Sequence, residues 1–149
     1  MHYQSERKIG RPRAEVFRAF TDLERVPTRV EGIERLEVLT EGPMQVGTRF
    51  RETRKMFGRE ATEEMTVTEF TELRGYVATA ESCGARYRAE YTFDDAADGT
   101  KVSFTFEAKP VTFMAKVMTP ITGPLARRMM KKCFEKDMDD LTAAIEGGR

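Results

Sequence analysis

Residues 86–108 read RYRAEYTFDDAADGTKVSFTFEA, and this stretch decides the fold. Apolar or aromatic residues occupy every second position on both sides of Asp98-Gly99, with polar residues between them. A period of two is that of a β-strand with one buried face, and Asp-Gly favours a tight hairpin turn. The stretch therefore predicts two antiparallel strands, 86–94 and 100–108, which share one apolar and one polar face.

The same alternation continues upstream, where turn-forming residues separate the segments at Gly42-Pro43, Phe57-Gly58 and Cys83-Gly84. We expect one further strand near the N-terminus and four more before residue 86, each of ordinary length for an antiparallel sheet. These strands are 3–9, 33–40, 48–56, 60–70 and 75–82. Short connections of this kind place successive strands side by side.

Helices are predicted near both ends of the chain. Apolar residues at helical spacing follow Pro12 and indicate a short helix. Apolar residues recur every three or four positions over 125–145 and indicate a long one. Breaks are expected before it, at Pro120 and at Gly123-Pro124. The order of elements predicts an α+β fold in which the long C-terminal helix covers the apolar face of the sheet.

Length, composition and charge limit the class of protein. The 149 residues, 40% hydrophobic and 34% charged, suit one domain spanning 1–149. Lys plus Arg and Asp plus Glu number 25 each, so no global basic field attracts nucleic acid. The sequence has no apolar run of about 18 residues and no apolar leader. We therefore expect a soluble, cytoplasmic monomer or homodimer without stable membrane insertion.

The chain lacks the residues of several common catalytic sites. Its only histidine is His2, so no internal imidazole is available for a Ser-His-Asp triad, a Cys-His pair or a multi-histidine metal site. Cys83 and Cys133 stand too far apart for a zinc knuckle, and we interpret both as packing residues. We expect no metal and no cofactor.

Several short motifs occur in an order that resembles a known superfamily. They are Arg7-Lys8-Ile9, Gly47-Thr48-Arg49-Phe50, Tyr91-Thr92-Phe93, Gly99-Thr100-Lys101-Val102 and Asp140-Leu141. Their order resembles the polyketide cyclase/dehydrase-like branch of the SRPBCC, or START-related, superfamily over nearly the whole chain. The resemblance implies a helix-grip fold: a curved seven-stranded antiparallel sheet wrapped around a long C-terminal helix, with an internal cavity for an apolar or aromatic small molecule. Carriers, hormone receptors and cyclases share such folds, so the fold alone does not fix the function.

Three charged residues of strands 48–56 and 60–70 are predicted to share the apolar face of the sheet. A turn at Phe57-Gly58 pairs Glu52 with Glu63, whereas a turn one residue later pairs Arg54 with Glu63. Both registers leave the three charges on one face, which is expensive unless they are paired or border a wet cavity. Either the strand edge curls away and exposes them, or they orient a ligand at the polar end of a cavity. In the second case Glu52 or Glu63 is a candidate for proton transfer.

Tyrosines and alanines alternate on the hairpin predicted over 75–82 and 86–94. A turn at Cys83-Gly84 pairs Tyr76 with Tyr91 and Ala80 with Tyr87. The small alanines leave room beside phenols, which combine an apolar ring with a polar tip. Ordinary core packing of the rings is the alternative. The candidate ligand-binding residues are Phe50, Arg54, Met65, Tyr76, Tyr87, Tyr91, Phe104 and Met130.

A basic cluster of Arg127, Arg128, Lys131 and Lys132 lies on the predicted long helix. Acidic residues follow it at once, between 135 and 140, and are expected to cancel its field. This cancellation disfavours a role at a membrane surface.

Three functions are considered for this sequence. A protein-binding role, similar to that of the chaperone-ATPase activators that share the fold, requires a broad exposed apolar patch, which the alternating charges of the outer face disfavour. Two functions remain. The first is binding or transport of a small hydrophobic molecule, aromatic or polyketide-like, in an internal cavity. The second is a polyketide cyclase/dehydrase-type enzyme in which Glu52, Glu63 or a tyrosine moves protons. The carrier is the favoured interpretation, and a small hydrophobic molecule is the partner expected in either case.

Overall fold

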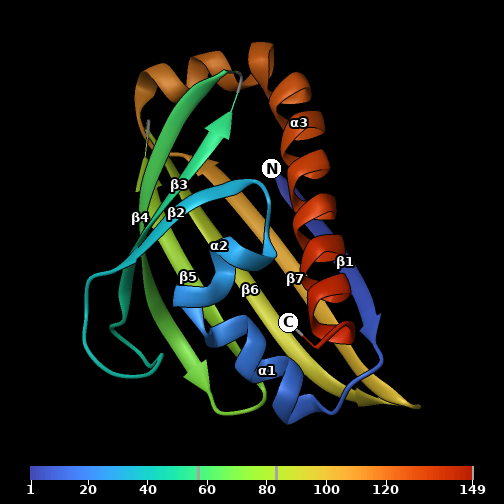
Figure 1. Ribbon diagram of the computed structural model, residues 1–149. Helices are drawn as coiled ribbons and strands as arrows, with labels where there is room; N and C mark the ends of the chain where they lie inside the picture. The colour runs from blue at the N-terminus through green and yellow to red at the C-terminus, as the bar shows by residue number, and fades with distance from the viewer. Residues whose placement is uncertain (57, 83, 149) are drawn as a thin grey trace.

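The computed structural model describes residues 1–56, 58–82 and 84–148 (Figure 1). For residues 56 and 118–122 it describes the backbone alone. Two of the residues expected in turns, Phe57 and Cys83, lie outside this part of the chain, and so does the packing role expected of Cys83. The elements, in chain order, are β1 (His2–Ile9), α1 (Arg13–Thr21), η1 (Leu23–Arg25), α2 (Val26–Arg29), β2 (Ile33–Val38), β3 (Arg49–Met56), β4 (Arg59–Thr71), β5 (Gly75–Ser82), β6 (Ala85–Ala96), β7 (Gly99–Pro110) and α3 (Phe113–Glu146).

The seven strands form one antiparallel sheet in the order β1-β7-β6-β5-β4-β3-β2. The sheet curves, so that β1 and β2 are its edges and its inner face is concave (Figure 1). α3 descends along the side of β1 and β7, while α1 and α2 close the lower end of the concave face (Figure 1). The helix-grip fold predicted from the sequence is confirmed.

The strand register agrees with the turns predicted from the sequence. β3 and β4 pair as a turn at Phe57-Gly58 predicts, with Glu52 opposite Glu63. The register with the turn one residue later is wrong. β5 and β6 pair Tyr76 with Tyr91, also as predicted. A one-residue slip would move the whole apolar set of a strand to the wet face, so burial of one face fixes the register that the turns select.

α3 is longer than the sequence analysis predicted, because it does not break at Pro120 or at Gly123-Pro124. Thr112 caps its first turn, where its Oγ1 accepts a hydrogen bond from a backbone amide at 3.2 Å. A proline inside a helix removes a hydrogen bond and bends the axis. Figure 1 shows the first turns of α3 crossing the upper end of the sheet before its longer part descends. The segment with prolines and glycine therefore bends the helix instead of ending it.

An aromatic cluster at the lower end joins α1 to the sheet. Phe93 of β6 is fully buried, and its ring meets the rings of Phe17 and Phe20 edge-on, each with a centroid distance of 5.2 Å. Edge-to-face contacts of this kind add to the hydrophobic gain of burial. The two α1 residues follow the helical spacing seen in the sequence, so the amphipathic face of α1 is what seats it on the sheet.

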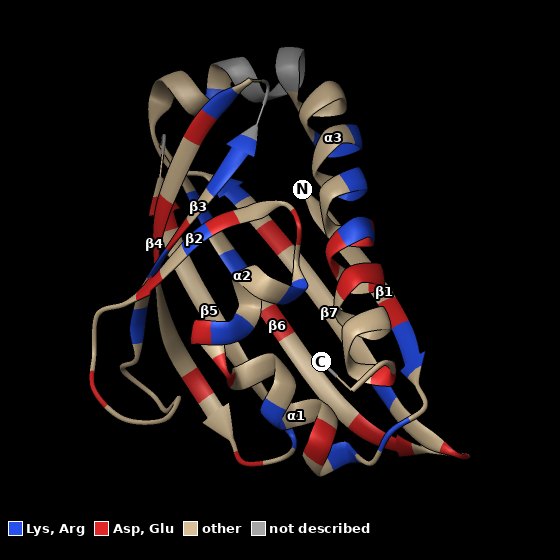
Figure 2. Cartoon of the chain, viewed as in Figure 1, with Lys and Arg blue, Asp and Glu red and all other residues tan. Residues whose placement is uncertain are grey.

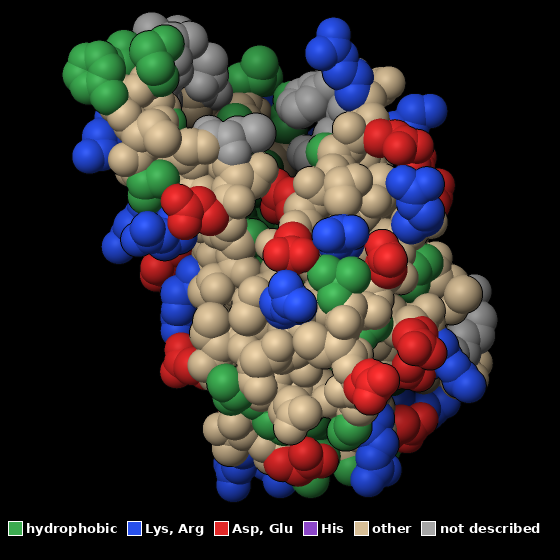
Figure 3. All heavy atoms as spheres, turned by 90° about the vertical axis from the view of Figure 1, so that its left-hand side faces the viewer, with side chains coloured by type: hydrophobic (Ala, Val, Ile, Leu, Met, Phe, Trp, Pro, Cys, Tyr) green, Lys and Arg blue, Asp and Glu red, His purple; other side chains and the backbone are tan. Residues whose placement is uncertain are grey.

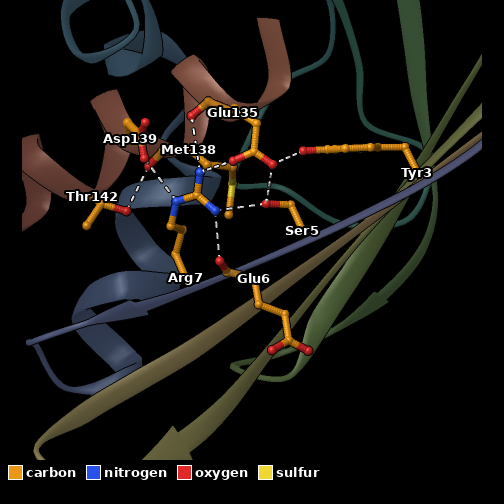
Figure 4. A network of polar contacts seen from close by, with 8 residues as sticks. All are labelled: Tyr3, Ser5, Glu6, Arg7, Glu135, Met138, Asp139 and Thr142. Atoms are coloured by element: carbon orange, nitrogen blue, oxygen red, sulfur yellow. Dashed lines mark hydrogen bonds and ion pairs between the residues drawn. The ribbon is translucent and has the colours of Figure 1, made fainter. Parts of the chain in front are cut away.

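Polar contacts attach α3 to β1 at the other side of the sheet (Figure 4). Arg7 donates from Nε to the Asp139 carboxylate at 3.0 Å and forms an ion pair with Glu135. The hydroxyls of Tyr3 and Ser5 donate to the same Glu135 carboxylate. One strand of alternating residues thus presents three polar groups to one turn of the helix. These contacts hold the descending part of α3 at the sheet edge.

Replacing Phe93 with Ala should lower the free energy of unfolding by about 3–5 kcal/mol, because it removes a fully buried ring and leaves a cavity. Phe113→Ala is the matched control: that ring is 79% exposed, so the change should stay within about 0.5 kcal/mol. Urea denaturation of both variants measures the difference. Equal effects would contradict the described core.

Glu135→Gln should destabilise the protein at neutral pH and have little effect in acid. The hydrogen bond from Tyr3 and the contacts with Arg7 lower the pKa of Glu135 below its ordinary 4.5. A carboxyl group with a lowered folded-state pKa stabilises the fold above its unfolded pKa and loses that contribution as the pH falls through the folded value. Unfolding of Glu135→Gln and the wild type across this range tests the difference. Glu81→Gln, in an exposed pair with Arg86, should change little at any pH.

Candidate functional site

A cavity of about 290 Å³ lies between α3, the inner face of the sheet and the segment from α1 to β2. The sheet contributes aromatic and small residues from five neighbouring strands, β3 to β7. The segment from α1 to α2 contributes aliphatic and aromatic side chains, and α3 contributes both apolar and charged ones. The apolar lining is made by Phe20, Leu23, Val26, Val30, Ile33, Leu36, Phe50, Ala61, Met65, Tyr76, Ala78, Tyr87, Ala89, Tyr91, Phe104, Phe106, Met130, Cys133, Phe134, Met138 and Leu141.

The structure places every candidate site residue named from the sequence on the wall of this one cavity. The eight candidate ligand-binding residues are Phe50, Arg54, Met65, Tyr76, Tyr87, Tyr91, Phe104 and Met130, and the two candidate proton-transfer residues are Glu52 and Glu63. Met130 lies on α3, and the other nine share one face of the sheet, because residues two apart in a strand point to the same side. The charged residues are therefore not exposed on a curled edge.

Facing alanines make room in the middle of the sheet. Ala78 lies opposite Ala89, and this pair is followed on one side by Tyr76 opposite Tyr91. The two tyrosine rings stack with centroids 4.9 Å apart, and Tyr91 also packs 4.8 Å from Phe104. Because the methyl groups between the large rings are short, the sheet surface is hollowed there. The result is an aromatic pocket floor with a recess at its centre.

Arg54 organises the polar end of the cavity. Its Nε donates to Glu52 on the same strand at 2.5 Å. Its two terminal nitrogens donate to both oxygens of Asp137 on α3, at 3.2 and 2.5 Å. The Arg54, Glu52 and Asp137 side chains are only 19%, 18% and 17% exposed. The guanidinium thus spends three of its five N–H donors on two carboxylates, which compensate its charge.

The charges of this group shift its acid–base equilibria. Burial raises the pKa of Asp137, while the hydrogen bond and charge of Arg54 oppose that rise. The carboxylates of Glu52 and Asp137 raise the pKa of Arg54 against the effect of its burial. The guanidinium therefore remains charged at any physiological pH. It acts as a fixed link between β3 and α3.

Of the three carboxyl groups that line the described cavity, Glu63 is the one without an ion-pair partner. It faces Glu52 across the β3–β4 pair, and within the described residues it forms no hydrogen bond or ion pair. Burial raises the pKa of Glu63, as does the charge of Glu52, and the charge of Arg54 counteracts part of the effect. The surroundings of Glu63 thus favour its protonated form.

Tyr76 and Tyr91 also line the cavity, and their hydroxyl groups are protonated. Burial raises the pKa of Tyr76 and of Tyr91, and nearby carboxylates add to the effect. Both groups therefore stay protonated at neutral pH and keep an O–H to donate. Neither hydroxyl forms a hydrogen bond with a described residue. Every fully enclosed polar side-chain atom in the described part of the chain has a partner, so these two hydroxyls are not fully enclosed. Both phenols are available to a bound molecule.

Sequence reasoning missed two parts of this site. Asp137 belongs to the run of acidic residues on the long helix, and no local signal showed that it faces Arg54. The wall from α1, η1 and α2, including Phe20, Leu23 and Val26, was predicted only as a short helix and its end. Its apolar residues at helical spacing were the available signal.

Metal clusters and membrane-spanning helices are both absent from residues 1–56, 58–82 and 84–148. In that part of the chain, no three His, Cys, Asp or Glu side chains are arranged to hold a metal ion. No helix within it is both long and apolar enough to cross a membrane.

A curved antiparallel sheet that grips one long helix around an internal cavity defines the helix-grip class of folds. Residues 1–146 match the family described as polyketide cyclase / dehydrase and lipid transport, and the chain belongs to this family. No protein of curated function matches the sequence.

Solved structures share the fold at low sequence identity. TTHA0849 from Thermus thermophilus has a TM-score of 0.83 at 19% identity and covers 99% of both chains. The di-domain ARO/CYC StfQ from the steffimycin biosynthetic pathway has a TM-score of 0.78 at 11% identity, over 98% of this chain and 50% of StfQ. Ara h 8.0201 has a TM-score of 0.69 at 18% identity over 97% of both chains. At these identities the likeness shows the fold.

Replacing Glu63 with Gln should stabilise the protein at neutral pH. A carboxyl group with a raised folded-state pKa ionises more readily in the unfolded chain, so it costs stability once the pH exceeds its unfolded value, near 4.5. The gain should disappear below that pH, where the wild-type group is protonated in both states. Thermal unfolding at several pH values measures it. Glu64→Gln, the exposed neighbour on the outer face, should show no such gain.

Proposed function

We propose that this protein binds and carries a compact, neutral hydrophobic molecule with an aromatic part, held in the cavity between α3 and the sheet. One observation carries the proposal: an aromatic cavity ends in a polar group whose only cation is already bound to two carboxylates. Apolar walls with a few placed polar groups are typical of small-molecule sites. The volume of about 290 Å³ favours a compact ligand.

The charge of the lining selects against anions. Three carboxyl groups, Glu52, Glu63 and Asp137, and one guanidinium, Arg54, are the charged groups of the lining. Because the charge of Arg54 is already paired with two carboxylates, an incoming carboxylate would meet no unpaired cation and at least one net negative charge. A buried unpaired charge is strongly disfavoured. Free fatty acids and other anions should therefore bind poorly, and neutral molecules should bind well.

The unpaired polar groups indicate how a neutral ligand is oriented. Tyr76 and Tyr91 offer phenolic donors, and Glu63, when protonated, offers a third. These donors suit a ligand with carbonyl or hydroxyl oxygens on an otherwise apolar frame. The stacked rings provide flat surfaces for an aromatic part of the same molecule.

A polyketide cyclase/dehydrase-type enzyme is the second candidate. The observation that favours it is the protonatable Glu63 in one cavity with two phenols, which can supply or accept protons without a histidine. The likeness of one half of StfQ, which is named as an ARO/CYC, also supports it. In this interpretation the cavity holds a reactive chain in a folded conformation.

Dye binding tests the carrier proposal. The neutral dye Nile red should bind more tightly than the anionic 1-anilinonaphthalene-8-sulfonate, because only the second brings a charge into the site. Tyr91→Ala should weaken binding of Nile red. Ala78→Met should also weaken it by filling the recess, and this variant removes no aromatic ring. Val46→Ser, at an exposed site outside the lining, is the control and should bind like the wild type. Tighter binding of the anion would contradict the proposal.

Incubation with aromatic polyketides, followed by mass spectrometry, separates carrier from enzyme. A carrier returns each bound compound unchanged, and Glu63→Gln then alters affinity alone. For an enzyme that uses Glu63, the same variant should lose roughly 10²–10⁴-fold in rate while the substrate still binds. Any conversion above the rate without protein would refute the carrier.

A further inference from the structure

Exposed hydrophobic side chains gather at the beginning of α3. Within the described residues, five large hydrophobic side chains are exposed, and four of them belong to this region of the helix: Phe113 at 79%, Met114 at 67%, Val117 at 47% and Leu125 at 63%. Figure 3 shows hydrophobic side chains projecting at the upper corner of the molecule, over the first turns of α3. Single exposed apolar residues are common, but a cluster on one element marks an interaction surface.

The same part of the chain is uniformly basic. From Lys109 to Phe134 it contains six Lys or Arg and no Asp or Glu. Arg127, Arg128, Lys131 and Lys132 are exposed, and none forms an ion pair with a described residue. Leu125, Arg128 and Lys132 follow at helical spacing, so apolar and basic residues share one stripe. Figure 2 shows the basic residues on the upper turns of α3 and the acidic ones below them.

The acidic residues that follow contact other cations, so they cancel this field less completely than the sequence analysis expects. Glu135 and Asp139 pair with Arg7. Asp137 pairs with Arg54, and Asp140 pairs with Lys136. The four carboxylates thus share three cations outside the basic cluster, Arg7, Arg54 and Lys136. The four basic residues themselves form no ion pair with a described residue, so no direct contact neutralises their charge.

We propose that this surface, the α3 docking face, binds peripherally to the surface of an anionic lipid bilayer. It consists of the exposed apolar residues Phe113, Met114, Val117 and Leu125 and the basic residues Arg127, Arg128, Lys131 and Lys132. Apolar side chains enter the boundary between headgroups and acyl chains, while Lys and Arg contact anionic headgroups. A second copy of this chain fits less well, because a symmetric contact would bring two basic clusters together, neither of which has an ion-pair partner of its own among the described residues.

The docking face goes beyond the proposed ligand binding and does not depend on it. Met130, between the two pairs of basic residues, lines the cavity from the same helix. Docking would therefore bring the cavity wall close to the lipid. Vesicle binding is measured without any cavity ligand, so failure of one proposal leaves the other intact.

Flotation with vesicles tests the docking face. The wild type should float with vesicles of phosphatidylcholine and phosphatidylserine and stay behind with phosphatidylcholine alone. Each basic residue near an anionic surface strengthens binding about fivefold, so replacing Arg127, Arg128, Lys131 and Lys132 by Gln should weaken it more than about a hundredfold. Phe113→Ser with Met114→Ser should also reduce it at least about tenfold, because acyl contacts are lost.

A matched control removes the same charge elsewhere. Lys8, Arg18, Arg74 and Lys101 are exposed and lie outside α3. Replacing these four by Gln should leave vesicle binding within about threefold of the wild type, since charges beyond a Debye length are screened.

Three results would overturn the proposal. One is equal binding, or no binding, to neutral and anionic vesicles. Another is an equal loss in both fourfold variants, which would reflect net charge alone. The third is self-association in sedimentation velocity without lipid that Phe113→Ser with Met114→Ser abolishes, because a second copy would then cover this face.

Discussion

The cavity exists because α3 packs at the β1 and β7 side of the sheet and not across its middle. One helix cannot cover seven strands, and the curvature of the sheet leaves the inner faces of the central strands apart from it. Apolar side chains of α1, η1 and α2 close the lower end, where Phe93 joins them to the sheet. Alanines at the centre of β5 and β6 keep the remaining space open. The contacts of Arg7 with Glu135 and Asp139 hold the helix at this side and so preserve the gap.

Arg54 spans that gap and makes it a polar site at one end. Its side chain lies under the helix, where an unpaired guanidinium would be costly, and the two carboxylates compensate it. The carboxyl groups outnumber the single guanidinium, because Glu63 adds a third carboxyl group that has no ion-pair partner among the described residues. The same geometry therefore ties β3 to α3 and supplies the excess of carboxyl groups on which the proposed preference for neutral ligands rests. Arg54 thus has a structural role, as the link between β3 and α3, and also sets the charge of the cavity.

Much of the fold was predictable, because turns and alternation together determine strand register. Glu52 opposite Glu63 and Tyr76 opposite Tyr91 follow from counting residues away from two turns, which is why the candidate residues lie on one wall. The position of α3 was not predictable in the same way. The rotation of a helix relative to a distant strand depends on tertiary packing. No pattern in the neighbouring sequence therefore indicates that Asp137 contacts Arg54. The prolines of α3 misled for a related reason, since a helix can bend at a proline instead of ending there.

The start of α3 is joined to the tip of the β5–β6 hairpin by backbone contacts. The amides of Val111 and Thr112 both donate to the Gly84 carbonyl, at 2.7 and 3.3 Å. Gly84 has a φ of 76°, and a Cβ there would stand 2.5 Å from the Thr112 hydroxyl, so glycine permits this approach. A displacement of the first turns of α3 away from the sheet would have to break these bonds or carry the hairpin tip along. The two segments thus form one mechanical unit at the upper rim of the fold.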